Sequence, residues 1–584
     1  MGWCFVYSAT RSRSYSGPSY DAYRAPAGQS SVVIPEGVKA LDEDSFIECK
    51  EMVSVVIPKS VTQIEDNPFW CCPNLSSITV ARGNRKFDSR EGCNAIIEKQ
   101  TNILHVGCKD TVIPDSVCQI GDNAFAGCES LTAIDIPDSI IQIGRYAFAG
   151  CIGLKTVAIP NSVKKICIGS FAGCTGIESV SLPDGLFSIQ ARTFYGCSGL
   201  RSNTIPDSVH IIGADAYTGC TRLLSVKIPK SVTLIDGNVF KHCESLQSIE
   251  VDEENLCFDS RKGCNAIIAT KNEYRETLIS GCKNTIIPDT VECIGNSAFE
   301  GCTGLTSLII PTSVKYIGSG VFKDCPNIPS ITIPDSVLDI RSEAFMNCTG
   351  LTSFTIPNSI EMIMDEAFRG CVGITTLVIP STVKTIGHGV LFDCTALESF
   401  TFPRNIKPPY KERGNTAIED YILGRRSSEL GFTAIKDKDN NTVTFRRTNK
   451  EIKKTDTVRP FYEGRINNRL FIWDKSSLWL EPRSYSSIKS IVIPEIVDCV
   501  DGFGGFRELQ SVELPSHVKT ICDNTFIWCT SLTSIFLPGS ITEIGARVFA
   551  QCSNLKTIYV PRRKTDYFKK LLPKRLWPLI KEKR

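Results

Sequence analysis

Proline recurs every 23 residues along most of this 584-residue chain. The period runs through four series: Pro35 and Pro58; Pro114, Pro137, Pro160, Pro183, Pro206 and Pro229; Pro288, Pro311, Pro334, Pro357, Pro380 and Pro403; and Pro515, Pro538 and Pro561. A period of 20–50 residues indicates a solenoid, because one repeat cannot bury its apolar face alone. Stacking the repeats buries that face and builds a quasi-one-dimensional core. Each 23-residue unit is called a rung below.

Each part of a rung has a predicted role. The rung reads I-P-x-S-V-x-x-I-G-x-x-A-F-x-G-C-x-x-L-x-x-I-x, which contains the L-x-x-L-x-L core of leucine-rich repeats. Leu131, Ile134 and Ile136 predict a short parallel strand on the concave side, with its apolar side chains inward. Pro137 lacks an N–H group and ends that strand. The V-x-x-I segment predicts a second short strand, and A-F-x-G-C predicts one helical or 3₁₀ turn that buries the phenylalanine.

Two long rungs and one insertion interrupt the period. Residues 81–114 and 252–288 repeat the same text, F-D-S-R-x-G-C-N-A-I-I, and each is predicted to hold a hairpin within the solenoid. We expect five segments: a flexible N-terminal segment 1–30, a solenoid 31–403, an irregular basic and β-rich insertion 404–487, a second solenoid section 488–560, and a basic C-terminal cap 561–584.

The rungs resemble BspA-like leucine-rich repeats, of which I-P-D-S-V-x-x-I-G-x-x-A-F-x-G-C-T-G-L-T-S is typical. The long rungs are similar to the alternate rung of bacterial members, and the ending T-I-Y-V-P to Y-F-K-K-L-L-P is similar to that family's C-terminal cap. The resemblance implies a secreted or surface-exposed protein of the adhesion type. It implies no catalytic residues.

Cysteine is abundant, with 27 residues, of which 15 occupy one column of the repeat. Metal binding through cysteine needs close pairs such as C-x-x-C, and the chain has none. Equivalent residues of stacked rungs lie about 4.8 Å apart with parallel side chains, whereas disulfide-bonded Cβ atoms converge to about 3.8 Å. We therefore predict a column of buried free thiols that pack as small apolar groups.

The outward face of the strands is the candidate binding surface. Side chains of a strand alternate, so the third and fifth positions of L-x-x-L-x-L point outward. Sixteen of seventeen readable rungs have Ser or Thr at the third position, and Ala133 is the exception. This pattern predicts a docking face for an extended polypeptide or glycan, but it is also the composition that keeps a strand soluble. The candidate residues on this face are Asp135, Ser179, Lys227, Glu250, Ser307, Thr332, Ser353 and Thr355.

Charge and motifs narrow the function classes. The net charge of +2 hides an asymmetry: 404–490 and 561–584 each carry +8, which leaves the solenoid strongly acidic. The chain has no P-loop, nucleophile-elbow, zinc-protease or dinucleotide motif. Its five histidines lie in different rungs. We predict no enzyme activity, cofactor or metal, no small-molecule substrate and no nucleic-acid partner.

Three hypotheses remain. The first is a non-enzymatic scaffold for a protein or glycan ligand, acting in adhesion at a cell surface. The second is an intracellular scaffold of the same shape, because residues 1–30 lack the apolar core of a secretory signal. The third is a nucleic-acid-binding or enzymatic module within 404–487, where basic and aromatic residues gather. No apolar run reaches the length of a membrane span.

Asn203 departs from the repeat because it takes an inward strand position, where other rungs have Val, Ile or Leu. A buried amide needs hydrogen-bond partners. We expect neighbouring backbone groups to supply them.

Overall fold

The computed structural model describes residues 23–404 except 47–48, 66 and 271–275, short stretches between 406 and 516, and residues 518–583 except 523. Residues 1–22 of the predicted N-terminal segment lie outside the described residues. Much of the insertion 404–487 lies outside them as well. The chain forms two compact units. Unit 1 comprises 29–43 and 50–453, and unit 2 comprises 454–584 with two short N-terminal segments.

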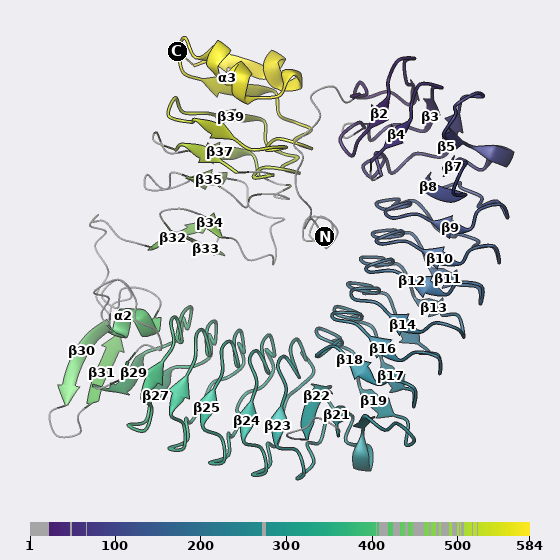
Figure 1. The fold of residues 1–584 in the computed structure, drawn as a ribbon. Coiled ribbons are helices and arrows are strands. Elements are labelled where there is room, and N and C mark those ends of the chain that lie inside the picture. Colours follow the sequence, from purple (N-terminus) through teal and green to yellow (C-terminus); the bar gives the residue numbers. More distant parts are fainter. Residues whose placement is uncertain are drawn as a thin grey trace. The chain divides into compact units, whose positions relative to one another are not determined.

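Unit 1 is a solenoid of parallel rungs (Figure 1). Thr156 pairs with Ser179, and Ser179 pairs with Ser202, so successive strands are offset by one 23-residue period. The predicted leucine-rich repeat solenoid with 23-residue units is confirmed. Most rungs contribute to two strand columns, because the proline that ends the first strand turns the chain toward the second.

The first column presents the Ser and Thr residues and is called the hydroxyl face. Its strands in unit 1 are β1 Ser31–Val33, β3 Ser54–Ile57, β5 Ser77–Val80, β11 Thr156–Ala158, β13 Ser179–Ser181, β15 Ser202–Asn203, β17 Ser225–Ile228, β19 Ser248–Val251, β27 Thr376–Val378 and β29 Ser399–Pro403.

The second column comes from the V-x-x-I segments. Its strands in unit 1 are β2 Ala40–Leu41, β4 Gln63–Ile64, β9 Gln119–Ile120, β10 Gln142–Ile143, β12 Lys165–Ile166, β14 Ser188–Ile189, β16 Ile211–Ile212, β18 Leu234–Ile235, β23 Cys293–Ile294, β24 Tyr316–Ile317, β25 Asp339–Ile340, β26 Met362–Ile363 and β28 Thr385–Ile386.

Each long rung adds an antiparallel hairpin to the second column. The first contains β6 Phe87–Asp88, a 3₁₀ turn Arg90–Gly92, β7 Ala95–Glu98 and β8 Ile103–Gly107. The second contains β20 Phe258–Asp259, a 3₁₀ turn Arg261–Gly263, β21 Ala266–Ala269 and β22 Thr277–Gly281. In both, the last hairpin strand pairs in parallel with the next second-column strand, which returns the chain to the regular repeat.

The A-F-x-G-C segment forms a third column, the turn column, and here the structure differs from the expected helical turn. Ala149 N–H donates to Tyr146 O at 3.0 Å, and Cys151 N–H donates to Phe148 O at 3.1 Å. Tyr146 and Gly150 have φ of 53° and 70°. These left-handed residues prevent a continuous helix, so the segment is a pair of tight turns, and glycine is favoured at the second left-handed position.

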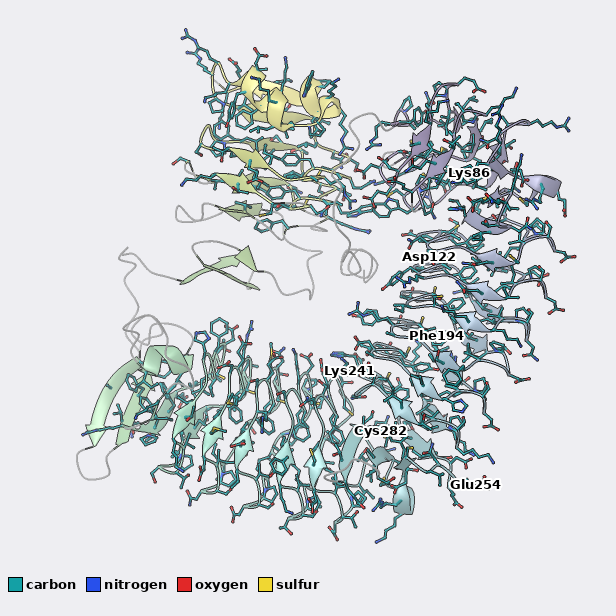
Figure 2. All side chains as sticks on the ribbon, in the orientation of Figure 1. Lys86, Asp122, Phe194, Lys241, Glu254 and Cys282 are labelled. Atoms are coloured by element: carbon teal, nitrogen blue, oxygen red, sulfur yellow. The ribbon has the colours of Figure 1, made fainter. Side chains whose placement is uncertain are left out.

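The core of unit 1 is a stack of aromatic rings. Phe125, Phe148 and Phe171 are fully buried and stacked, with neighbouring ring centroids 5.0 and 5.2 Å apart. Figure 2 labels Phe194, the next member of the stack. Each ring gains contacts only when its neighbour is present, which is why a single rung has no stable fold of its own.

Asn203 is buried, but its observed partner is a side chain rather than the backbone that we expected. Tyr217 takes the place of phenylalanine in the next rung, and its hydroxyl lies 3.4 Å from Asn203 Oδ1. The Asn203 amide nitrogen has no hydrogen-bond partner. Two departures from the repeat in adjacent rungs therefore face each other across the core.

Unit 1 ends in an antiparallel sheet. Strand β31 Thr442–Arg447 pairs antiparallel with β29, and β30 Phe432–Asp437 pairs with β31. Phe400 and Phe445 stack with their ring centroids 5.3 Å apart. The short helix α2 Ile418–Leu423 adds Ile422 to the same core. The start of the insertion thus covers the last rung of unit 1 with an edge strand of opposite direction.

Unit 2 carries further rungs and a C-terminal helix. Its elements are β32 Phe461–Ile466, β33 Arg469–Asp474, β34 Leu478–Trp479, β35 Ser490–Val492, β36 Cys499–Val500, β37 Ser511–Glu513, β38 Thr520–Ile521, β39 Ser534–Phe536, β40 Glu543–Ile544, β41 Thr557–Val560, α3 Thr565–Leu571, a 3₁₀ turn Lys574–Leu579 and β42 Ile580–Glu582. Phe568 of α3 is fully buried against the last rung.

Candidate binding face

The hydroxyl face follows directly from strand alternation. In β13, Val180 is buried, whereas Ser179 and Ser181 on either side of it are exposed. Their neighbours in β11, Thr156 and Ala158, are exposed as well. The same period that builds the core therefore builds a row of small polar side chains on the opposite side of the sheet.

All eight predicted residues lie on this face and are exposed. They are Asp135, Ser179, Lys227, Glu250, Ser307, Thr332, Ser353 and Thr355. The structure does not gather them into one site. Lys227 and Glu250 are direct neighbours in the register of β17 and β19, and Lys227 Nζ lies 3.3 Å from Asp252 Oδ2. Only Thr332, Ser353 and Thr355 line a common hollow.

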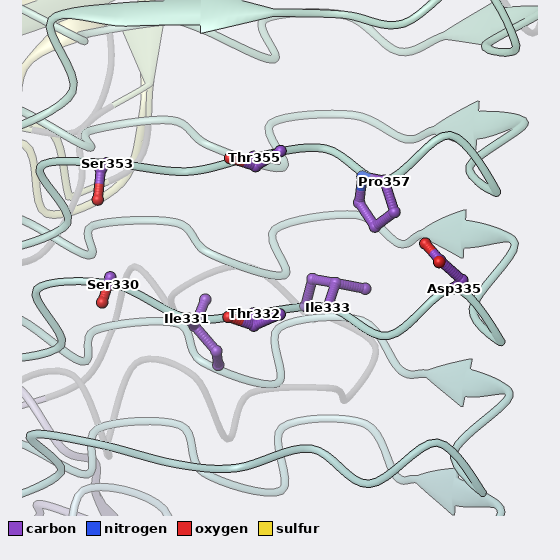
Figure 3. A pocket seen from close by; sticks show the side chains of 8 residues that line it. All are labelled: Ser330, Ile331, Thr332, Ile333, Asp335, Ser353, Thr355 and Pro357. Carbon is purple, nitrogen blue, oxygen red and sulfur yellow. The ribbon is translucent and has the colours of Figure 1, made fainter.

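This hollow has a volume of about 290 Å³ and lies between two adjacent rungs (Figure 3). Ser330 and Thr332 come from one rung, and Ser353 and Thr355 from the next. Asp335 and Pro357 close one end of it. The sequence analysis missed Ser330 and Asp335 as lining residues, although Ser330 belongs to the same Ser/Thr column.

The first strand column is irregular around the hollow. No strand is assigned to residues 305–310, 328–333 or 351–356, nor to 131–136, where the sequence predicted one, although the side chains of all four segments follow the repeat. In regular rungs the residue before the Ser or Thr donates to the rung behind it, as Glu178 N–H donates to Lys155 O at 2.8 Å. Pro329 stands at that position and has no N–H to donate. The bond from this rung to the one before it is therefore missing, whereas Thr352 N–H still donates to Pro329 O at 3.1 Å between the two rungs that line the hollow.

The cysteine column is buried, and its thiols act as hydrogen-bond donors. Cys151, Cys174 and Cys197 are fully buried, and each donates its S–H to the carbonyl oxygen of the phenylalanine 26 residues earlier, at 3.0 to 3.3 Å. Burial raises the pKa of the Cys197 thiol to about 12. The described cysteines are free thiols. Each of these three cysteine side chains therefore fills space in the core and also donates a hydrogen bond to a buried carbonyl oxygen. The sequence predicted only the first of these roles.

A polar cluster that the sequence analysis did not predict lies in the turn column. Within the described part of the chain, His242, Glu300 and Asp324 bring three possible metal-ligand atoms within 4.8 Å of one another. Burial alone would raise the pKa of Glu300, but its interactions with His242 and Ser297 and the positive charge of Lys241 outweigh it and lower the pKa to about 2. The available sequence signal was that His242 and Asp324 stand in a column where glycine is the commonest residue, in seven of fifteen rungs.

The model of the BspA-type leucine-rich repeat region matches the chain in six copies. They cover residues 20–102, 105–223, 187–265, 277–398, 321–418 and 483–571. This chain belongs to the BspA-type leucine-rich repeat family. The matched residues include the hollow and parts of both long rungs, with 103–104 and 266–276 outside the matches.

Solved structures of bacterial leucine-rich repeat proteins are similar to this BspA-type protein. A leucine-rich cell surface protein from Faecalibacterium prausnitzii is 26% identical, with a TM-score of 0.44, over 68% of this chain and 91% of its own. A leucine-rich repeat protein from Eubacterium ventriosum is 17% identical, with a TM-score of 0.37, over 80% and 93%. One from Bacteroides ovatus is 19% identical, with a TM-score of 0.27, over 85% and 98%. A comparison with curated protein sequences finds no match.

The BspA-type family is built on a repeat scaffold and not on an enzyme fold. Solenoids of this kind present extended surfaces to other proteins. Within the described residues, no helix combines the length and apolarity that crossing a bilayer requires. The hypothesis of a nucleic-acid-binding or enzymatic module concerns 404–487, much of which lies outside the described residues.

Proposed function

We propose that this BspA-type protein is a non-enzymatic interaction scaffold that uses its hydroxyl face to bind an extended protein segment in adhesion at a cell surface. The observation that carries the proposal is the hollow between Ser330, Thr332, Ser353 and Thr355, where hydroxyl groups of two adjacent rungs line a surface with no regular strand assigned. Hydroxyls both donate and accept hydrogen bonds, so this surface suits the alternating N–H and C=O groups of an extended main chain.

The surroundings of the hollow also favour a peptide over a small molecule. Ile309, one rung before Ser330, is 86% exposed and offers an apolar contact on the same face. The hollow is lined by polar side chains such as Ser330 and by apolar ones such as Ile331 (Figure 3). A partner that covers two or more rungs would bury Ile309 and bond to the hydroxyls at once. A glycan is the alternative ligand, because hydroxyl groups recognise sugars by the same hydrogen bonds.

Binding can be tested on this face without disturbing the core. Thr332→Lys and Thr355→Lys place a bulky charge at exposed positions of the hollow. The control is Thr175→Lys, which changes an exposed residue of the turn column. The full chain and the three variants are applied to arrays of extracellular matrix proteins and of glycans. Loss of a protein signal at least tenfold in the two face variants alone supports the proposal, and loss of a glycan signal alone supports the alternative.

The cell-surface location rests on the family, whose resemblance implies exposure and adhesion. Labelling of intact cells with a membrane-impermeant reagent, followed by fractionation, separates this location from the intracellular alternative. A wholly cytosolic pool would exclude adhesion and leave the intracellular scaffold. Binding that is equal in all variants would remove the hydroxyl face from the proposal.

A further inference from the structure

The turn column crosses each long rung without stopping. The long rungs have no A-F-x-G-C segment of their own, so the turn of the preceding rung stacks directly on the turn of the following rung. The first seam joins residues 67–72 to 121–128, and the second seam joins 238–243 to 295–302. At the second seam, His242 N–H donates to Glu300 O at 3.0 Å.

Three side chains converge at the second seam. His242 Nε2 lies 3.5 Å from Glu300 Oε1 and 3.8 Å from Asp324 Oδ2. The three side chains are 24%, 15% and 7% exposed, so the cluster is largely buried but can be reached from solvent. His242 belongs to the rung before the long rung, and Glu300 and Asp324 belong to the two rungs after it.

These distances suit ligands of one ion better than direct hydrogen bonds. A hydrogen bond from a ring nitrogen to a carboxylate oxygen is usually 2.7–3.2 Å long. Two ligand atoms that each lie about 2.1 Å from a tetrahedral zinc ion are about 3.4 Å apart. Imidazole and carboxylate together are ligands of zinc-class metal ions. We propose that His242, Glu300 and Asp324 bind one divalent transition-metal ion of the zinc class, which fastens the rungs on either side of the second long rung.

Gly301 makes this convergence possible. A Cβ atom at Gly301 would lie 2.2 Å from His242 Nδ1 and 2.6 Å from its Cγ. The imidazole therefore passes over the glycine and reaches Asp324, two rungs along the column. Asn347, one rung further, donates from Nδ2 to Asp324 Oδ1 at 2.9 Å. That bond orients the carboxylate so that Oδ2 faces His242, as outer-shell hydrogen bonds orient metal-binding carboxylates.

The neighbouring lysines are directed to other carboxylates. Lys241 Nζ lies 2.7 Å from Asp215 Oδ1, and Lys323 pairs with Glu343. A neutral imidazole with two carboxylates then carries two negative charges, which matches a divalent cation. With three protein ligands, the fourth tetrahedral position is left for water.

The first seam is an internal control for this site. Its equivalent positions hold Cys71, Ala126 and Gly150 in place of His242, Glu300 and Asp324. The seam stacks in the same way without a ligand set, so the three residues of the second seam are not required by the stacking itself. The residues of the first seam also indicate which substitutions at the second seam the turn column can accommodate.

The test uses the purified full chain after removal of metal with a chelator. Co²⁺ is titrated and followed by absorbance, because thiolate ligands give a sulfur-to-metal charge-transfer band and nitrogen and oxygen ligands do not. We expect one Co²⁺ per chain without that band, and displacement by Zn²⁺. His242→Ala and the double variant Glu300→Ala with Asp324→Gly should each lower the affinity at least tenfold. The control His210→Ala removes a histidine that stacks on Phe187 outside the cluster, and it should bind as the original chain does.

Thermal unfolding provides the second readout. Saturating Zn²⁺ should raise the Tm of the original chain and of His210→Ala, but not that of the double variant, because a ligand stabilises only the state that binds it. The double variant takes the residues of the first seam, and a cooperative unfolding transition shows that it is folded. Metal binding that is equal in His242→Ala, a cobalt site with thiolate absorption, or no metal binding at all would each overturn the proposal.

Discussion

The two long rungs of unit 1 are nearly identical in their framework and different at their seams. Asn84 Nδ2 donates to the carbonyl oxygens of Pro58 and Val61, and its counterpart Asn255 donates to those of Pro229 and Val232. Lys86 of the first long rung and Glu254 of the second are labelled in Figure 2. Residues shared by the two long rungs, such as Asn84 and Asn255, are those that the hairpin needs. Residues that differ, such as His242 at the second seam, are particular to one seam.

A buried asparagine holds each seam. Asn67 Nδ2 donates to Asn123 O at 3.1 Å, and Asn238 Nδ2 donates to Ser297 O at 2.6 Å. The side chain thus reaches main-chain carbonyls of the rung beyond the long one. The long rung is tolerated because this amide, together with main-chain bonds such as His242 N–H to Glu300 O, reconnects the turn column where its period is broken.

The largest predicted difference concerns thiol reactivity. Cys257 of the second long rung is partly exposed and stands where the first has Lys86. Cys93 and Cys264 are equivalent and buried, and burial raises the pKa of both thiols. Native alkylation followed by peptide mass spectrometry should modify Cys257 about a hundredfold faster than Cys93 or Cys264, which react only on local opening. Fast labelling of the buried cysteines of the repeat column in the native protein would contradict the packing described above.

The second prediction compares the glycines of the two seams. A Cβ at Gly127 would lie 2.3 Å from the main-chain oxygen of Trp70, whereas at Gly301 it would first meet the His242 ring. Both glycines also have positive φ. Gly127→Ala and Gly301→Ala should each destabilise the protein by about 2–5 kcal/mol. The His242→Ala background should relieve part of the cost at Gly301. Denaturant midpoints measure both effects, and an absent rescue would show that the ring is not the obstacle.

The third prediction concerns the seam asparagines. Asn67→Ala and Asn238→Ala should each cost about 1–3 kcal/mol, because buried main-chain groups lose their partner. Asn238→Ala should cost more, since Ser280 Oγ also donates to Asn238 Oδ1, at 2.7 Å. Val106 is the equivalent of Ser280 in the first long rung. Ser280→Val should therefore remove the difference between the two asparagine variants, and a double-mutant cycle measures this coupling.

The smallest expected effect is a pH dependence that belongs to the first long rung alone. Burial lowers the pKa of His105, although the negative charge of Glu98 opposes the shift. Because the folded pKa lies below the unfolded value of about 6.5, the unfolded chain binds the proton first, and stability is lost as the pH falls through this range. Ile279 is the equivalent residue of the second long rung. His105→Ile should reduce the change of the denaturant midpoint between pH 7 and pH 5. If the midpoint of the variant changes with pH as much as that of the original chain, other groups cause the acid sensitivity.

The period made most of the fold predictable. Pro137 and its equivalents, the inward Leu and Ile positions and the buried phenylalanines each have a role that depends only on neighbours one period away. The outward positions Thr332, Ser353 and Thr355 were predictable for the same reason. The hollow itself was not, because it depends on how the side chains of two adjacent rungs are spaced where no regular strand is assigned. His242, Glu300 and Asp324 lie far apart in the sequence, and a histidine without a nearby partner carries no signal of its own.

The amino-acid sequence by itself determined the stack of rungs, the hydrophobic interior and the row of hydroxyl groups, because each of these repeats with the chain. The tertiary structure alone decided which exceptions meet. Asn203 faces Tyr217, and His242 passes over Gly301 toward Asp324. Asn203 and Tyr217 meet across two regular rungs, and His242 meets Asp324 because the turn column continues across the long rung. The repeat pattern gives the position of each exception, but it does not show which exceptions come into contact.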